Sequence, residues 1–221
     1  QPDWHGDFRD FRKLGRPRLF FAISPGAMDS MVNRYTANRR LRHDDAYSPD
    51  GRHDMRPDYP SIVYSKILKQ LFPDVPVVLG GIEASMRRLT HYDYWQDCLK
   101  KCILCESGAD LILYGMGEKN TLMLCHELES GQSIRDVKDI QDEIPGGITD
   151  EDIVLHSHEE CLRNKKAEAE NFRHIEEESN KMHAQRLIQG VDNLYAAVNP
   201  PFPPMTTEEL DAAYDLPYTR M

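Results

Sequence analysis

The feature that most constrains this chain is a repeated order of apolar run, glycine turn and helical pattern. Three largely apolar runs, at residues 19–23, 75–79 and 110–114, are each followed by a turn that contains glycine. Runs of this kind are typical of strands buried on both faces, as in a parallel sheet. Parallel strands need crossover connections, which are usually helices. The order therefore predicts an α/β fold.

Helical patterns fill the gaps between the predicted strands. Residues 60–72 carry apolar side chains at three- and four-residue intervals behind a proline, which the first turn of a helix tolerates. Residues 94–107 and 121–130 are predicted helices, each closed by a glycine. The alternation predicts a Rossmann-like, doubly wound and mostly parallel sheet flanked by helices over residues 1–155.

The C-terminal part has a different pattern. Ser157, with Glu160 three residues later, has the spacing of a capping box at the start of a long helix. Apolar residues flank Gly190-Val191-Asp192-Asn193, which is a hairpin signal. A stiff proline-rich linker follows at 199–204, ahead of a short helix. Residues 156–221 are therefore predicted to hold a long helix, a β-hairpin and a linker to a further domain.

The composition places the chain among ordinary globular proteins. It has 221 residues, of which 40% are hydrophobic and 29% charged. No apolar run approaches the ~18 residues that a membrane-spanning helix needs, and no secretory signal is evident. Five cysteines, an odd number, then indicate reduced thiols and a cytoplasmic location.

Charge gives little indication of a nucleic-acid partner. The net charge is −10, and broad nucleic-acid binding needs the opposite sign. One cluster has the composition of a phosphate grip: Arg34, Arg39, Arg40 and Arg42, beside Tyr35. Charged runs of this kind are usually solvated surface, and that interpretation is favoured. The loop at 43–59, rich in proline and charge, is long enough to be either functional or disordered.

The carboxyl ends of the predicted strands are the expected place for a ligand. In an open parallel sheet these ends share one rim, where glycine turns let backbone N–H groups approach an anion. Such a rim holds a ligand, for instance a phosphate or nucleotide, or contacts another domain; the plainer interpretation is that its glycines only make tight turns. The candidate residues are Ser24, Asp29, Asn33, Gly80, Gly81, Glu83, Ser85, Gly115, Gly117 and Glu118. None has an evident nucleophile or base partner, so no catalytic residue is predicted.

The motif Cys98-x-x-x-Cys102-x-x-Cys105 has the spacing of three thiolates that hold a 4Fe-4S cluster in radical S-adenosylmethionine (SAM) enzymes. Cluster cysteines of that kind lie on a loop, whereas these fall within the helix predicted at 94–107. Their spacing of four and three residues places them on one helical stripe, where free cysteines pack as small apolar side chains. Core thiols are the favoured interpretation, and an iron–sulfur or metal site is the alternative.

Several strings of the chain are informative when taken together. They include Met28-Asp29-Ser30-Met31-Val32-Asn33, Arg56-Pro57-Asp58-Tyr59, Gly80-Gly81-Ile82-Glu83-Ala84-Ser85, His91-Tyr92-Asp93-Tyr94-Trp95 and Tyr114-Gly115-Met116-Gly117-Glu118. These strings resemble the N-terminal region of the YgiQ-type radical SAM proteins, and the resemblance covers nearly the whole chain. More distantly, the strand and glycine turns resemble cobalamin-binding-type Rossmann domains. The Asp-x-His-x-x-Gly signature of cobalamin binding is absent from the chain.

The resemblance carries expectations about the rest of the protein. It implies that an opening strand precedes this chain and that a catalytic barrel with a 4Fe-4S cluster and SAM follows it. It also implies that the cluster ligands lie in that barrel, not at Cys98, Cys102 or Cys105, and that cobalamin is not bound. We therefore expect an accessory domain, inactive alone, that covers the barrel and helps to hold an unidentified substrate. Its expected partners are its own barrel and that substrate, small or macromolecular, without membrane or nucleic acid.

Overall fold

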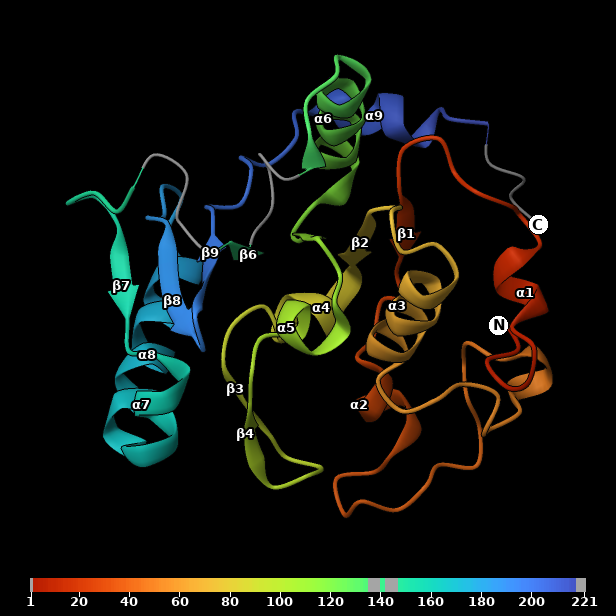
Figure 1. Ribbon diagram of the computed structural model, residues 1–221, viewed down its shortest axis with the longest axis horizontal. Coiled ribbons are helices and arrows are strands. Elements are labelled where there is room, and N and C mark those ends of the chain that lie inside the picture. The colour runs from red at the N-terminus through yellow and green to blue at the C-terminus, as the bar shows by residue number, and fades with distance from the viewer. Residues whose placement is uncertain (1, 135–139, 142–146, 218–221) are drawn as a thin grey trace.

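The computed structural model describes residues 2–134, 140–141 and 147–217 (Figure 1). Its first sheet has three strands, β1 (Phe21–Ile23), β2 (Val77–Gly80) and β5 (Leu111–Leu113), in the order β1-β2-β5. All are parallel, with Ala22 beside Val78 and Leu79 beside Ile112. The α/β class and the parallel sheet are therefore confirmed, and each strand lies within one residue or two of the predicted run.

Helices cover both faces of this sheet. On one face, Val77 and Leu79 pack in a buried cluster with Tyr64 and Leu68 of α3 (Pro60–Leu71). On the other face, Val78 and Leu111 pack with Leu124 of α6 (Gly117–Glu129). Alternate strand residues point to opposite faces, which explains why these strands are apolar without interruption.

The strand order bears on the predicted doubly wound arrangement. Among the described strands the spatial order β1-β2-β5 follows the chain order without reversal. A doubly wound sheet reverses direction at a switch point, and the crevice at that point is where its ligand binds. The three described strands therefore confirm a parallel sheet, and the Rossmann-like, doubly wound arrangement stays a prediction.

The helix predicted at 94–107 is wrong. A hairpin of β3 (His91–Asp93) and β4 (Cys98–Lys100) occupies most of that stretch, followed by the short α5 (Ile103–Ser107). The Asp93 carboxylate accepts a hydrogen bond from the Gln96 backbone N–H at 2.8 Å, which closes the turn. Trp95 in that turn stacks on the ring of Tyr35, 5.5 Å between centroids. Contacts with a distant segment thus replace the local helical preference.

A second sheet, which the sequence did not predict, lies beside the first (Figure 1). Its four strands are β6 (Ile140–Gln141), β7 (Ile153–Leu155), β8 (Leu187–Val191) and β9 (Leu194–Val198), in the order β6-β9-β8-β7. Strands β8 and β9 form the hairpin that the turn at 190–193 predicts, while β7 pairs with β8 in parallel. Buried side chains of both sheets belong to one apolar cluster, which includes Leu79, Leu89 and Leu187.

The long helix predicted after Ser157 is divided in two. α7 (His158–Arg163) ends at Asn164, and α8 (Lys165–Ser179) begins directly after it. Asn164 has an extended backbone, and its side chain accepts a hydrogen bond from the Lys166 N–H at 3.0 Å. Asparagine is a strong N-cap residue, so this side chain starts a new helix where an uninterrupted one was expected.

Four short elements complete the described chain: α1 (Arg9–Arg12), α2 (Ser30–Arg34), the 3-10 turn η1 (Pro49–Gly51) and α4 (Gly81–Met86). After the proline-rich segment at 199–204 comes α9 (Thr207–Tyr214), where Thr206 and Glu209 form a capping box. In the described part of the chain, no helix combines the length and apolar character that crossing a membrane requires.

Candidate functional site

The carboxyl edge of the β1-β2-β5 sheet holds the turns that sequence analysis singled out. Because the strands are parallel, the segments that follow β1, β2 and β5 leave the sheet at the same edge. The first two turns touch: a Cβ built on Gly81 would lie 2.9 Å from the Ser24 Oγ and 3.1 Å from the Gly26 carbonyl oxygen. Gly81 also has a φ of +80°, which side chains rarely adopt. Glycine is required at this position for both reasons.

The third turn lies against the C-terminal segment. A Cβ on Gly115 would lie 3.8 Å from the Cβ of Pro201. Gly117 and Glu118 line a groove between α6 and α9, which also contains Leu122, Met205, Ala213 and Leu216. The structure thus places Gly115, Gly117 and Glu118 with the C-terminal helix. Ser24, Gly80, Gly81 and Ser85 lie with the first two turns, where the Ser85 hydroxyl donates to the Gly81 carbonyl at 2.9 Å.

Asp29 is buried and forms the N-cap of α2. Its carboxylate accepts hydrogen bonds from the backbone N–H groups of Met31 and Val32 and forms an ion pair with the buried Arg87. Arg87 also donates to the Glu83 carbonyl at 3.2 Å, at the end of α4. Asp29 therefore joins α2 to α4, and its side chain is engaged in the fold instead of being open at the edge.

Glu83 is completely buried. Its Oε1 accepts a hydrogen bond from the Ser61 backbone N–H at 2.9 Å, in the first turn of α3. Its Oε2 has no hydrogen-bond partner among the described residues. A carboxylate is favourable at an uncapped helix N-terminus, where backbone N–H groups lack intrahelical partners. Glu83 thus holds α3 and α4 together beneath the edge.

The long loop at 43–59 is ordered by a buried ion pair between Arg56 and Asp45. Two parallel hydrogen bonds join them, Nε to Oδ2 and Nη2 to Oδ1, both at 2.9 Å. Asn33 donates to the same carboxylate at 2.7 Å, and Arg56 Nη1 donates to the Pro25 carbonyl at 3.1 Å. Burial raises the pKa of Asp45, but the hydrogen bonds from Arg56, from the Tyr47 backbone and from the Ser48 and Asn33 side chains outweigh it and lower the pKa below its usual range. The loop is thereby fixed to the turn after β1.

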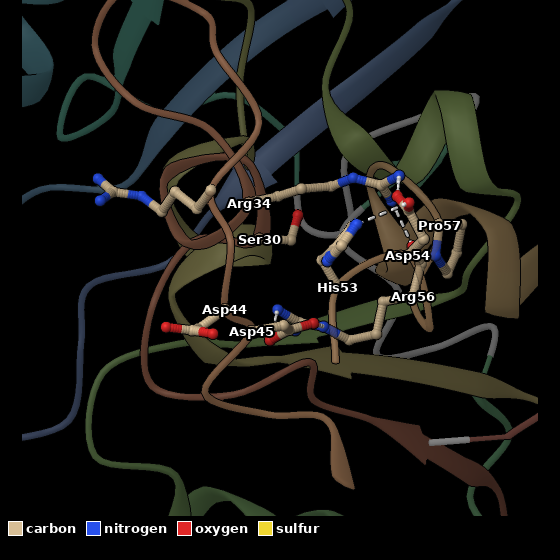
Figure 2. A pocket seen from close by; sticks show the side chains of 9 residues that line it. Ser30, Arg34, Asp44, Asp45, His53, Asp54, Arg56 and Pro57 are labelled. Atoms are coloured by element: carbon tan, nitrogen blue, oxygen red, sulfur yellow. Dashed lines mark hydrogen bonds and ion pairs between the residues drawn. The ribbon is translucent and has the colours of Figure 1, made fainter. Parts of the chain in front are cut away.

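Figure 2 shows the charged hollow that this loop encloses, with Arg34 reaching toward Asp54 and Arg56 lying beside Asp45. Arg34 donates to an Asp54 oxygen at 2.6 Å and to the Arg56 carbonyl. Arg42 donates through Nε to the carbonyls of Val32 and Tyr35. Arg34 therefore holds the loop, and Arg42 fixes the segment that precedes it. The favoured interpretation of a solvated surface does not describe Arg34, whose side chain is only 23% exposed.

A second polar cleft of about 300 Å³ opens between α3 and the β3–β4 hairpin. Tyr59 donates to Asp93 at 2.6 Å, and the guanidinium of Arg87 lies 5.3 Å from the centre of the Tyr59 ring. Burial, followed by the Asp93 carboxylate, raises the pKa of Tyr59, so its hydroxyl stays protonated. Burial also lowers the pKa of His91, which keeps the imidazole neutral near pH 7. The cleft presents fixed charges and hydrogen-bond donors to whatever enters it.

Sequence reasoning missed the residues that organise this region: Asp45, Arg56, Tyr59, Arg87 and Asp93. Their partners lie 11, 34 or 58 positions away along the chain, so no helix or strand spacing rule relates them. The one available signal was that Arg56, Tyr59 and Asp93 lie inside the strings on which the family resemblance rests.

The three cysteines of the cluster-like motif are not brought together. Cys98 is exposed on β4, whereas Cys102 is fully buried as the N-cap of α5. Only Cys102 and Cys105 are neighbours, with 3.4 Å between their sulfur atoms. Across the described residues, no three His, Cys, Asp or Glu side chains are grouped to hold a metal ion. The thiols therefore do not fit a 4Fe-4S cluster, and the single helical stripe predicted for them is wrong because Cys98 lies on a strand.

Comparison with known proteins gives consistent matches. The sequence matches the family described as Radical SAM N-terminal over residues 1–221. It is 60% identical to a UPF0313 protein of Bacteroides thetaiotaomicron and 59% identical to one of Porphyromonas gingivalis, in each case over 100% of this chain. A UPF0313 protein of Geobacter sulfurreducens is 43% identical over the same extent. The chain spans only 36–38% of the length of these relatives. No solved structure matches it.

Proposed function

Because this chain belongs to the Radical SAM N-terminal family, we propose that it is an accessory domain that packs on the catalytic part of a longer protein and helps to hold its substrate. The catalytic part would carry the 4Fe-4S cluster and SAM, which together supply radical chemistry when bound. The described thiols of this chain do not fit such a cluster, so the chain contributes shape and polar contacts and is inactive alone. A cytoplasmic location and a Rossmann-like fold of the whole domain belong to the same proposal.

The observation that carries the proposal is the groove between α6 and α9. It has a volume of about 740 Å³ and a largely apolar lining. Leu122 and Leu216, which line it, are among the exposed large apolar side chains. Exposed apolar patches of this kind mark contact sites. Since the relatives are more than twice as long as this chain, we infer that the remainder of the protein covers the groove.

The groove adjoins the carboxyl edge of the sheet through Gly117 and Glu118, so a partner seated there would face that edge. Ser24 and Glu118 have exposed side chains and are the groups we assign to substrate contact, with Ser85 and the glycine turns beside them. Asp29, Asn33 and Glu83 are buried, and we assign them to positioning. Phosphate or nucleotide recognition by the glycine turns is the second candidate, since such turns let backbone N–H groups approach an anion.

Hydrogen exchange on the full-length protein tests the proposal. We expect Leu122→Lys to speed amide exchange in α6, in α9 and in the surface of the catalytic part that covers them. The matched control is Leu162→Lys on α7, because Leu162 is about as exposed (56%, against 63% for Leu122) but lies on a different helix. If Leu122→Lys leaves exchange in the catalytic part unchanged while altering α6 alone, the proposed contact is wrong.

A further inference from the structure

Cys102 and Cys105 form a close thiol pair at the start of α5. Their sulfur atoms lie 3.4 Å apart, and the Cys102 thiol donates to the Cys105 sulfur. Cys102 is fully buried in the main apolar cluster, whereas Cys105 is half-buried at its border. The pair therefore has one thiol that solvent can reach and one that lies directly behind it.

This geometry is close to that of a disulfide. A disulfide has sulfur atoms about 2.05 Å apart, so the two thiols need to approach by little more than 1 Å. We propose that Cys102 and Cys105 are a dithiol–disulfide site that exchanges with a low-molecular-weight disulfide of the glutathione type. Neither the Radical SAM N-terminal family match nor the proposed contact with a catalytic part assigns such a role.

The exchange has two balanced steps. The Cys105 thiolate attacks one sulfur of the external disulfide, which forms a mixed disulfide and releases one thiolate. Cys102 then loses its proton and attacks the Cys105 sulfur, which closes the protein disulfide and releases the second external thiolate. Two protein thiols are oxidised and one external disulfide is reduced to two thiols, so electrons and atoms balance.

The surroundings of the pair support this division of roles. The hydrogen bond from Cys102 lowers the pKa of Cys105 and raises that of Cys102, so Cys105 is the thiol that ionises first. Lys101 further favours the Cys105 thiolate, while Asp192 and Glu106 oppose it. Cys98, Cys125 and Cys161 are free cysteines without a hydrogen bond to a second sulfur in the described ranges, so the pair is distinct from them.

A peptide experiment on the full-length protein tests the proposal directly. The protein is equilibrated in buffers of increasing glutathione disulfide, quenched in acid, alkylated and digested with trypsin. Cleavage after Lys101 and Lys119 releases a peptide that contains Cys102 and Cys105 and no other cysteine. We expect this peptide to change from the doubly alkylated form to an unalkylated disulfide form. The mass of that form is lower by two hydrogen atoms than the mass of the unalkylated dithiol peptide. Cys125 falls in the next peptide and is the internal control, which forms no such species.

Two variants separate the roles of the thiols. Cys102→Ser removes the resolving thiol, so we expect roughly tenfold more glutathione-capped Cys105 than in the unmodified protein. Cys105→Ser should leave Cys102 reduced, because Cys102 is buried. The wild-type peptide itself needs no variant, so the test holds even if a variant fails to fold. Persistence of the doubly alkylated peptide in fully oxidising buffer, or accumulation of capped Cys105 in the wild type, would overturn the proposal.

Discussion

Arg56 shows how one side chain fixes the geometry of a whole loop. Its guanidinium bonds both oxygens of Asp45 and the carbonyl of Pro25, and the side chain is only 3% exposed. Breaking a buried ion pair by removing one partner leaves the other charge uncompensated. We therefore expect Arg56→Ala to lower the free energy of unfolding by about 3–5 kcal/mol, measured by urea denaturation. Arg56→Lys should recover only part, since lysine lacks the planar fork.

The exposed pair of Arg16 and Asp74 is the matched control for Arg56. It has the same bidentate form, with distances of 2.9 and 2.7 Å, but both side chains are more than half exposed. Exposed pairs contribute about 0–1 kcal/mol because solvent screens them. Arg16→Ala should therefore change stability little. Equal losses in Arg16→Ala and Arg56→Ala would mean that burial is not the source of the effect.

Gly81 is the glycine for which the structure gives the strongest requirement. A Cβ there would meet Ser24 and the Gly26 carbonyl at 2.9 and 3.1 Å, in addition to the strain of a φ of +80°. We expect Gly81→Ala to cost about 2–3 kcal/mol in thermal or urea unfolding. Gly108→Ala is the control, because Gly108 has a φ of +69° and open space around it. It should cost only about 1–2 kcal/mol for the left-handed backbone, and a smaller loss at Gly81 than at Gly108 would contradict the steric argument.

At the scale of single residues, the sequence predicts where a residue lies in the fold better than it predicts which residue it contacts. The glycine turns at Gly26 and Gly81 do meet at the carboxyl edge, because parallel strands force that arrangement. The role of Glu83 under the edge was not predictable. Its partner is a backbone N–H of α3, and nothing in the local sequence indicates that contact.

At the scale of elements, helices and strands are predicted correctly where a long apolar pattern marks them. α3 was predicted within one residue because its buried stripe runs for three turns. The helix predicted at 94–107 rests on the closing glycine Gly108, but only 103–107 is helical, because cross-strand pairing of His91 with Lys100 makes the first part a hairpin. The second sheet is not predicted because β7 pairs with β8 across an intervening segment that holds α7 and α8, a pairing that no local signal encodes.

The junction of α7 and α8 is expected to depend on pH through His156. Its Nδ1 lies 3.0 Å from Glu160 and its Nε2 lies 2.9 Å from Glu170, one carboxylate from each helix. The hydrogen bonds to Glu170 and then Glu160 raise the pKa of His156. A raised pKa contributes stability that is present below the unfolded value of about 6.5 and is lost as the pH rises through the folded value.

The measurement is the unfolding temperature of the wild type and of His156→Gln at pH values below and above the unfolded pKa of histidine. We expect the wild-type unfolding temperature to decline above about pH 6.5 by more than that of His156→Gln. His174→Gln serves as the control, since the distance from the His174 Nδ1 to the Glu177 Oε2 is 3.9 Å, longer than either contact of His156. Identical pH profiles for the wild type and His156→Gln would exclude this role.

For the molecule as a whole, acid is expected to act through buried carboxylates. Burial raises the pKa of Asp93, but the Tyr59 hydroxyl and the backbone of Gln96 outweigh it, and the pKa of Asp93 is lowered, as is that of Asp45. A lowered pKa contributes stability above the unfolded value of about 3.9, which is lost as the pH falls through the folded value. We expect the free energy of unfolding to drop below about pH 4, with a shallower slope in Asp45→Asn. If Asp45→Asn has the same slope as the wild type, Asp45 does not contribute to the acid sensitivity.

The loop at 43–59 is tied to the body mainly by polar contacts, and this has a consequence for its motion. No residue of the loop belongs to the main apolar cluster, so we expect opening the loop to cost less free energy than opening the sheet. Because Arg56 also holds the Pro25 carbonyl, each opening releases the turn after β1. The ordering of the loop and the conformation of the turn after β1 are thus coupled. A ligand that binds the carboxyl edge only while the loop is ordered will shift the population toward the ordered loop. Slower amide exchange in the loop will then report that the edge is occupied, although the loop does not touch the ligand.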